Sequence, residues 1–399
     1  MIKKLSCFKD LKTIIWDVLF VVCFVLEQSF PHQTAAKIAL AAFCAFSVLM
    51  IVLTELRSLK ISYISVIFTV FIFTCYLGLR YGDPINVSGS KAMIATLALD
   101  LAFLICVYMF IRYTGVQRFI RVFLFSTAIS AITMLFMYFI AYGSFNMRDI
   151  EYANQNGVAI LAAIAMVFVI MNFRSYGLIS IPYLFIYLIF IAMSGTKKAI
   201  IAIALGLLIT IYLKYPKKLL RNIILSFAAF TALYLFVMKI PIVYETLGSR
   251  IESFVDYLGG GEGDASTVTR ARFIELGLEN YRLYPVWGIG VDGFRNLRYA
   301  FETYSHSNFV ELLCDTGMVG FIAYYSMHLL LFFDAVWVYL KGKRRFAVNA
   351  LIIIINVIVL DIAMVSYFER SNCLLLAFCA AFVSEGRRYG KIKKLREIS

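Results

Sequence analysis

A histidine with arginines on its N-terminal side is the group in this chain best suited to chemistry. His306 lies in the segment Tyr304-Ser305-His306-Ser307-Asn308, which closes a long polar stretch between hydrophobic segments. Arg270 and Arg272 precede it in the same stretch. A neutral imidazole can accept a proton, and fixed cations bind phosphate or pyrophosphate. The pattern therefore predicts a site in which a base acts beside a phosphate-bearing molecule.

The composition indicates what kind of protein must hold these residues. Of the 399 residues, 62% are hydrophobic and only 16% are charged. A soluble domain of this size does not contain so much apolar sequence, so we expect an all-α polytopic membrane protein. Apolar runs of roughly 17–25 residues predict about 12 transmembrane helices. Their expected centres are Phe20, Ala45, Phe71, Ala102, Thr133, Ala165, Ile186, Leu205, Ala229, Ala323, Ile355 and Ala377.

The distribution of positive charge predicts the topology. The net charge is +14, and the basic residues form short runs in alternate connections, such as Lys214 to Arg221 and Arg387 to Arg396. These runs should face the cytoplasm, and they do not indicate nucleic-acid binding. Both termini are then cytoplasmic. Residues 1–239 hold spans one to nine, 240–308 form an extracytoplasmic loop, and 309–399 hold spans ten to twelve and a basic cytoplasmic tail.

Two other connections bring cations to the predicted outer face. Arg148 lies before the sixth span, which opens with a polar segment containing Asn156, and Lys197 lies at the start of the eighth. These cations and the Arg270/Arg272 pair outnumber the acids around them. We therefore predict that Arg148, Lys197, Arg270 and Arg272 bind a phosphate or pyrophosphate group. No Cys-x-x-Cys pair is present, and neither a metal nor another cofactor is expected.

The long loop contains its own predicted structure. Residues 269–284 have the pattern of an amphipathic helix, with Phe273 and Gly277 on its apolar face, and such a helix could lie on the outer bilayer surface. Gly288, Gly290 and Gly293 formally make a GxGxxG motif, but no βαβ context surrounds it, so a dinucleotide site is rejected.

The tenth span begins directly after the histidine. Asn308 is predicted to be its N-cap, with Glu311 three residues later in a capping-box pattern. The positive end of that helix dipole would disfavour the imidazolium form of His306. His306 could therefore be a base, or it could simply anchor the loop at the interface.

Three acids lie inside apolar runs, where a charge costs about 2.5–3.5 kcal/mol on insertion scales. They are Asp100, Asp334 and Asp361. They either pair with cations at helix ends or mark an ion path, as in a transporter.

Four segments form a pattern together: Asn154 to Gly157, Ser194 to Lys197, Arg270 to Gly290, and Ser305 to Gly320. This pattern resembles the O-antigen ligase and O-antigen polymerase superfamily. The resemblance covers roughly residues 144–325 and is most specific in the last segment. It implies a GT-C-like fold and a metal-independent, inverting glycosyltransferase of the bacterial cytoplasmic membrane. Such an enzyme transfers glycans from undecaprenyl pyrophosphate on the outer face.

The resemblance also implies roles for individual residues. His306 would be the general base or would orient the acceptor, and Arg148 with the Arg270/Arg272 region would bind the pyrophosphate. Lys197 stands where many members have arginine. Lysine keeps the positive charge but loses the bidentate phosphate geometry of arginine. Asn156, Asn308 and Glu311 would support these groups.

Three functions remain open at this level. A polymerase would join repeat units of capsule, exopolysaccharide or O-antigen, whereas a ligase would transfer the finished glycan to lipid A core. Either would use a lipid-linked donor and a glycan acceptor within membrane lipids, with a flippase and a chain-length regulator as possible partners. A secondary transporter with 12 spans is the alternative from another class, but no internal repeat supports it.

Overall fold

The computed structural model describes residues 2–31, 33–53, 62–143, 154–214, 217–259 and 265–398. Within these ranges all regular structure is helical, which confirms the predicted all-α class. Arg148 lies outside the described residues. The chain divides into two compact units, Met1–Leu59 with Met109–Ile251 and Lys60–Tyr108 with Glu252–Ser399. These two units are defined by packing. The division into residues 1–239, 240–308 and 309–399, which is based on membrane topology, stays a prediction.

Every predicted span centre lies in a helix. These helices are α1 (Ile2–Ser29), α2 (Thr34–Leu53), α3 (Tyr63–Tyr81), α4 (Val87–Thr114), α5 (Val116–Tyr142), α6 (Gln155–Met171), α8 (Ser180–Ser194), α9 (Lys197–Lys214), α10 (Leu219–Lys239), α14 (Asn308–Leu340), α15 (Arg344–Leu360) and α16 (Arg370–Ile398). Among the described residues, seven helical segments are long and apolar enough to cross a membrane. The chain is therefore a polytopic membrane protein, whereas 12 spans and a GT-C-like arrangement stay predictions.

The first unit is built around aromatic side chains. Trp16, Phe20 and Phe43 of α1 and α2 pack with Phe110 and Phe119, with ring centroids between 5.2 and 6.1 Å apart. Helix α6 packs against α5, α8 and α9 and is buried along most of its length. Short helices α7 (Phe173–Tyr176) and η3 (Gly177–Ile179) connect α6 to α8.

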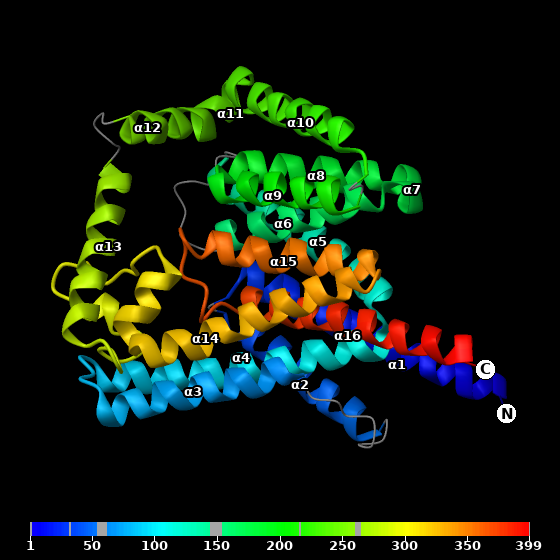
Figure 1. Cartoon of the computed structure of the whole chain (residues 1–399), viewed down its shortest axis with the longest axis horizontal. Helices are drawn as coiled ribbons and strands as arrows, with labels where there is room; N and C mark the ends of the chain where they lie inside the picture. The colour runs from blue at the N-terminus through cyan, green and yellow to red at the C-terminus, as the bar shows by residue number, and fades with distance from the viewer. Residues whose placement is uncertain are drawn as a thin grey trace. The chain divides into compact units, whose positions relative to one another are not determined.

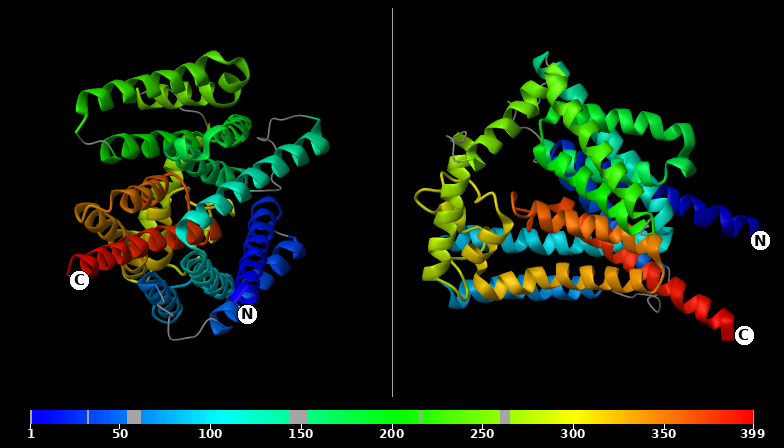
Figure 2. Two further views of the ribbon diagram at one scale, coloured as in Figure 1. Left: turned by 90° about the vertical axis from the view of Figure 1, so that its right-hand side faces the viewer. Right: turned by 45° about the horizontal axis from the view of Figure 1, so that its top comes forward.

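In the second unit, α14 lies along α3 and is flanked by α15 and α16 (Figures 1 and 2). Two of the predicted intramembrane acids are paired here with cations of α16. Asp100 forms an ion pair with Arg370 at 3.1 Å, and Asp334 contacts Arg387 and accepts a hydrogen bond from the Tyr63 hydroxyl. The pairing alternative is thus confirmed for these two acids.

The segment between α10 and α14 is largely helical. It contains α11 (Pro241–Val243), the π-helix η4 (Tyr244–Gly248), α12 (Ser249–Leu258), α13 (Ala265–Leu283) and the short 3-10 helix η5 (Phe294–Asn296). Helix α13 confirms the predicted helix at 269–284. The expected contact of its apolar face with the bilayer is wrong.

The apolar face of α13 is covered by the protein itself. Phe273 packs with Ile289, Phe294, Ala300 and Cys314 in a small buried core. A Cβ on Gly277 would lie 2.4 Å from Val310 Cγ1, so α13 approaches the start of α14 closely. Protein atoms therefore cover Phe273 and Gly277, and these two residues are not available to a bilayer.

Candidate active site

Helix α14 is broken at Gly317, eleven residues after the histidine. Gly317 has φ 62° and ψ −169°, so the helix consists of an arm before this residue and a longer part after it. The Met318 N–H donates to the Pro285 carbonyl oxygen at 2.8 Å, and a Cβ on Gly317 would lie 2.3 Å from the Val286 carbonyl oxygen. The loop after α13 therefore enters the break, and only glycine fits there.

The arm holds this loop through a buried carboxylate. Asp315 Oδ2 accepts from the Asp292 N–H at 2.9 Å and Oδ1 from the Phe294 N–H at 2.8 Å. The Tyr367 hydroxyl also donates to Asp315 Oδ2 at 3.2 Å. Gly288, with φ 69°, lies against the arm, since its Cβ would be 2.4 Å from the Asp315 carbonyl carbon. The glycines of the rejected GxGxxG motif thus serve close packing. The anchoring role of Asp315 could not be predicted from the sequence, because its partners lie more than 20 residues away along the chain.

His306 is held in a backbone conformation that histidine rarely adopts. Its φ is 63°, in the left-handed region, which costs about 1–3 kcal/mol. Both neighbours are fixed: the Ser305 N–H donates to Glu311 Oε2 at 2.6 Å, and the Ser305 hydroxyl donates to the Ser307 carbonyl oxygen at 2.9 Å. The imidazole lies edge-on to Tyr304, with centroids 4.5 Å apart. The loop therefore presents this ring in one orientation.

The predicted capping box is shifted. Ser307, not Asn308, is the N-cap of α14, and Glu311 bonds to Ser305 instead of the N-cap residue. The reason is the extended backbone at Ser307 and the left-handed turn before it, which bring the Ser305 N–H over the first helical turn. Glu311 is fully buried, so it positions the histidine loop rather than merely capping a helix.

Asn308 connects the arm to the segment between α15 and α16. Its Oδ1 accepts from the Ser366 N–H at 2.9 Å and the Tyr367 N–H at 3.0 Å. Its Nδ2 donates to the Tyr325 hydroxyl at 2.9 Å and to Asp361 Oδ2 at 3.2 Å. This buried network accounts for the third intramembrane acid, and it gives Asn308 a supporting structural role.

Arg270 lies on the same side of α13 as Phe273, whose ring stacks on His306 at 6.2 Å between centroids. The Arg270 Nε is buried and has no hydrogen-bond partner among the described residues. Partial burial and the charge of Glu369 raise the pKa of the Tyr304 hydroxyl, while the Arg270 charge acts in the opposite direction. Arg270 therefore brings positive charge to the neighbourhood of the histidine loop.

Arg295 adds a second cation that sequence reasoning did not place in the site. Its Nε lies 2.7 Å from Asp292 Oδ1, an ion pair without the alignment of a hydrogen bond. Its guanidinium lies over the Phe368 ring at 5.8 Å, and its charge also acts on Tyr304. The sequence feature that could have placed Arg295 in the site is its position in the same loop as Arg270.

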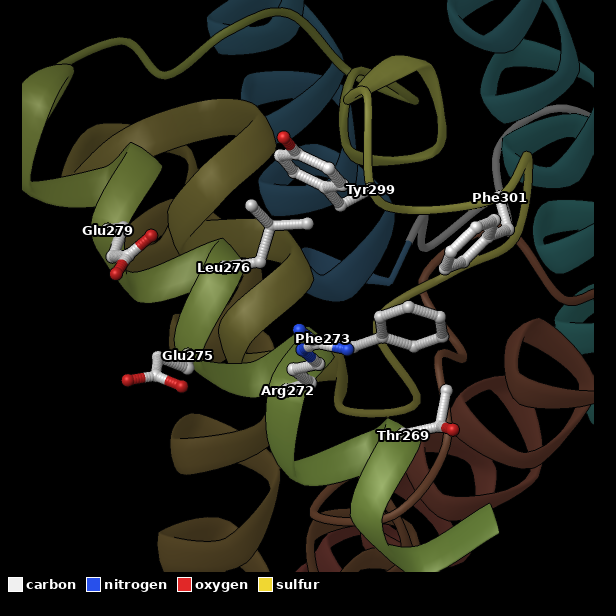
Figure 3. A pocket seen from close by; sticks show the side chains of 8 residues that line it. All are labelled: Thr269, Arg272, Phe273, Glu275, Leu276, Glu279, Tyr299 and Phe301. Atoms are coloured by element: carbon white, nitrogen blue, oxygen red, sulfur yellow. The ribbon is translucent and has the colours of Figure 1, made fainter. Parts of the chain in front are cut away.

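Arg272 does not join Arg270. Two residues along a helix correspond to a rotation of about 200°, and Arg272 is exposed on the other side of α13. There it borders a groove with the carboxylates of Glu275 and Glu279 (Figure 3). The structure thus separates the two arginines that the sequence grouped.

The other predicted residues belong to the first unit. Lys197 is the first residue of α9 and is half-buried. The Thr196 hydroxyl, directly before it, donates to Asn156 Oδ1 at 2.9 Å. Asn154 caps α6 by accepting from the Gly157 N–H at 2.9 Å. The start of α6 and the start of α9, which the sequence analysis predicted on the outer face, are therefore joined by a hydrogen bond within this unit.

The fold and these residues define a polytopic, all-helical membrane protein with a histidine- and arginine-bearing segment before a broken helix. Residues 182–325 match the family model described as O-antigen ligase, which confirms the resemblance over that part of the chain. The match runs from α8 into α14 and includes Lys197, Arg270, His306 and Glu311. It indicates a membrane enzyme that processes glycans. No curated protein matches the chain.

Proposed function

We propose that this protein is a glycosyltransferase that polymerises oligosaccharide repeat units linked to undecaprenyl pyrophosphate, on the outer face of the cytoplasmic membrane. The observation that carries the proposal is the fixed left-handed conformation of His306 beside Tyr304. Strained non-glycine residues gather at functional sites. The O-antigen ligase match across the same segment supports this assignment.

The proposed reaction is a single displacement. His306 accepts the proton of an acceptor hydroxyl, whose oxygen forms a bond to the anomeric carbon of the donor sugar. The bond from that carbon to the pyrophosphate oxygen breaks, and the electron pair leaves with the pyrophosphate. A base of this kind contributes about 10²–10⁴-fold to the rate. Displacement in one step inverts the anomeric centre.

The leaving pyrophosphate gains charge in the transition state, which fixed cations stabilise. Arg270 suits this role because its Nε is buried and has no hydrogen-bond partner among the described residues. Arg295 is a second candidate in the same loop. Arg148 and Lys197 stay predicted pyrophosphate ligands. For Arg272 the two neighbouring glutamates disfavour an anion, so we assign it a different role below.

A His306→Ala variant in the strain that carries this protein tests the proposal. We expect the ladder of surface glycan to collapse, with a single lipid-linked repeat unit accumulating, while immunoblots of the membrane fraction show normal amounts of protein. Arg282→Ala, an exposed residue at the end of α13, is the matched control. Accumulation of long lipid-linked chains would instead identify a ligase, and an unchanged ladder would refute the catalytic role of His306.

A further inference from the structure

A groove beside α13 has not been given a role in the reaction steps described above. It has a volume of about 270 Å³. Phe273 and Leu276 of α13 form one wall, and Tyr299 and Phe301 of the following loop face them (Figure 3). Tyr299 is 62% exposed and Phe301 is 75% exposed. The loop therefore presents two open aromatic faces at this groove.

The polar residues of the groove have mixed chemistry. Thr269, Arg272, Glu275 and Glu279 line it together with the aromatic side chains. Carboxylates accept hydrogen bonds from hydroxyl groups, guanidinium and hydroxyl groups donate them, and aromatic faces attract the C–H groups of a sugar ring. One arginine against two glutamates leaves a negative balance, which disfavours phosphate. These groups fit a neutral or amino-bearing saccharide.

The backbone that carries the aromatic wall is strained. Phe301 has φ 52° and Glu302 has φ 58°, so two successive non-glycine residues are left-handed. His306, at φ 63°, follows four residues later. Each such residue is held in place only when its surroundings require it, and these positions cluster where ligands are bound. The strain thus lies between the groove and the histidine.

The groove and the histidine share one side chain. Phe273 lines the groove, and its ring also stacks on the His306 imidazole with an interplanar angle of 12°. A general base acts on the hydroxyl of the acceptor. A saccharide in this groove would lie one side chain away from the base, which suits an acceptor whose hydroxyl is presented to His306.

We propose that this groove binds the terminal sugar of the acceptor saccharide by stacking on Tyr299 and Phe301. The assignment rests on the proposed function, because it takes His306 as the base. Arg272, Glu275 and Glu279 then select the hydroxyl pattern of the sugar. A groove of this size holds a short segment of glycan, so it would recognise the end of a repeat unit.

The test uses the full chain in lipid nanodiscs. The variants are the double substitution Tyr299→Ala with Phe301→Ala, the conservative Tyr299→Phe, and Leu283→Ala as a control for exposed apolar area on α13 outside the groove. We expect the double variant to raise the KM for the lipid-linked acceptor about tenfold while kcat stays within about twofold. Leu283→Ala should match the wild type, and Tyr299→Phe, which keeps the ring, should raise the KM much less than the double variant does. Unchanged KM in a double variant of normal thermal stability overturns the proposal.

A binding measurement separates this proposal from the proposed function. Saturation-transfer NMR with a soluble oligosaccharide of the same repeat should show binding to the wild type and to His306→Ala, and loss of binding in the double variant. Equal binding by the double variant would show that the sugar does not depend on Tyr299 and Phe301, and would overturn the proposal. Full turnover by His306→Ala would overturn the catalytic assignment alone, because the binding comparison does not depend on the base.

Discussion

The left-handed backbone of His306 allows its side chain and its conformation to be tested separately. Asparagine tolerates this region of backbone space, alanine does not, and glycine adopts it freely. A series of His306→Asn, His306→Ala and His306→Gly therefore removes the imidazole in every case but changes the backbone strain in a known order. If His306 is the base, all three variants lose activity to a similar extent, whereas their stabilities differ.

The magnitudes follow from the geometry. Loss of a general base should lower kcat by about 10²–10⁴-fold in each variant. At φ 63° a non-glycine residue carries about 1–2 kcal/mol of strain, which glycine relieves. Glycine also adds about 0.4–1 kcal/mol of chain entropy to the unfolded state. His306→Gly should therefore be as stable as the wild type or more stable by up to about 1.6 kcal/mol.

Two assays check the series. Turnover of the lipid-linked repeat by purified protein gives kcat, and thermal unfolding in detergent gives the order of stabilities. We expect Gly to equal or exceed Asn, and Asn to exceed Ala. More than about a tenth of the wild-type kcat in His306→Asn would exclude the base role. A clear loss of stability in His306→Gly would show that the strain argument is wrong.

Two further predictions concern the parts that hold the histidine loop. Gly317→Ala places a Cβ 2.3 Å from the Val286 carbonyl oxygen at φ 62°, so it should lower the unfolding temperature and the activity together; a thermal scan equal to wild type would contradict this. Glu311→Gln keeps an acceptor for the Ser305 N–H but adds an amide group where Glu311 Oε1 has no hydrogen-bond partner among the described residues. It should cost about 1–3 kcal/mol of stability and lower kcat with KM unchanged, whereas a change in KM alone would indicate a substrate contact.

The helices of this protein could be predicted because their signal is local. Apolar runs located all twelve centres, and the 3.6-residue period located α13 within a few residues of its bounds. What covers the apolar face of α13 could not be predicted in the same way. An amphipathic pattern shows that a face is buried, but a bilayer and a protein core produce the same pattern. The core around Phe273 depends on Ile289 and Cys314, which are distant in sequence.

The candidate site was predictable as a region but not as an arrangement. His306 and Arg270 were selected by residue type and place in the loop. Arg272 was grouped with Arg270 because sequence proximity was read as spatial proximity, although two residues along a helix point to different sides. The bond from Ser305 to Glu311 was missed because a left-handed histidine leaves no mark in the sequence.

The break in α14 lets one helix be both a candidate membrane span and a part of the candidate site. A continuous helix would extend the apolar span through Glu311 and Asp315, and charges within a span are costly. A break frees backbone groups, which in a membrane protein must find partners. The loop after α13 supplies such a partner, because the Pro285 carbonyl oxygen accepts a hydrogen bond from the Met318 N–H. The part after Gly317 is still longer than the roughly 20 residues that a span requires. The arm can therefore leave the direction of the span, and its two acids fix the loops that carry His306 and Asp292.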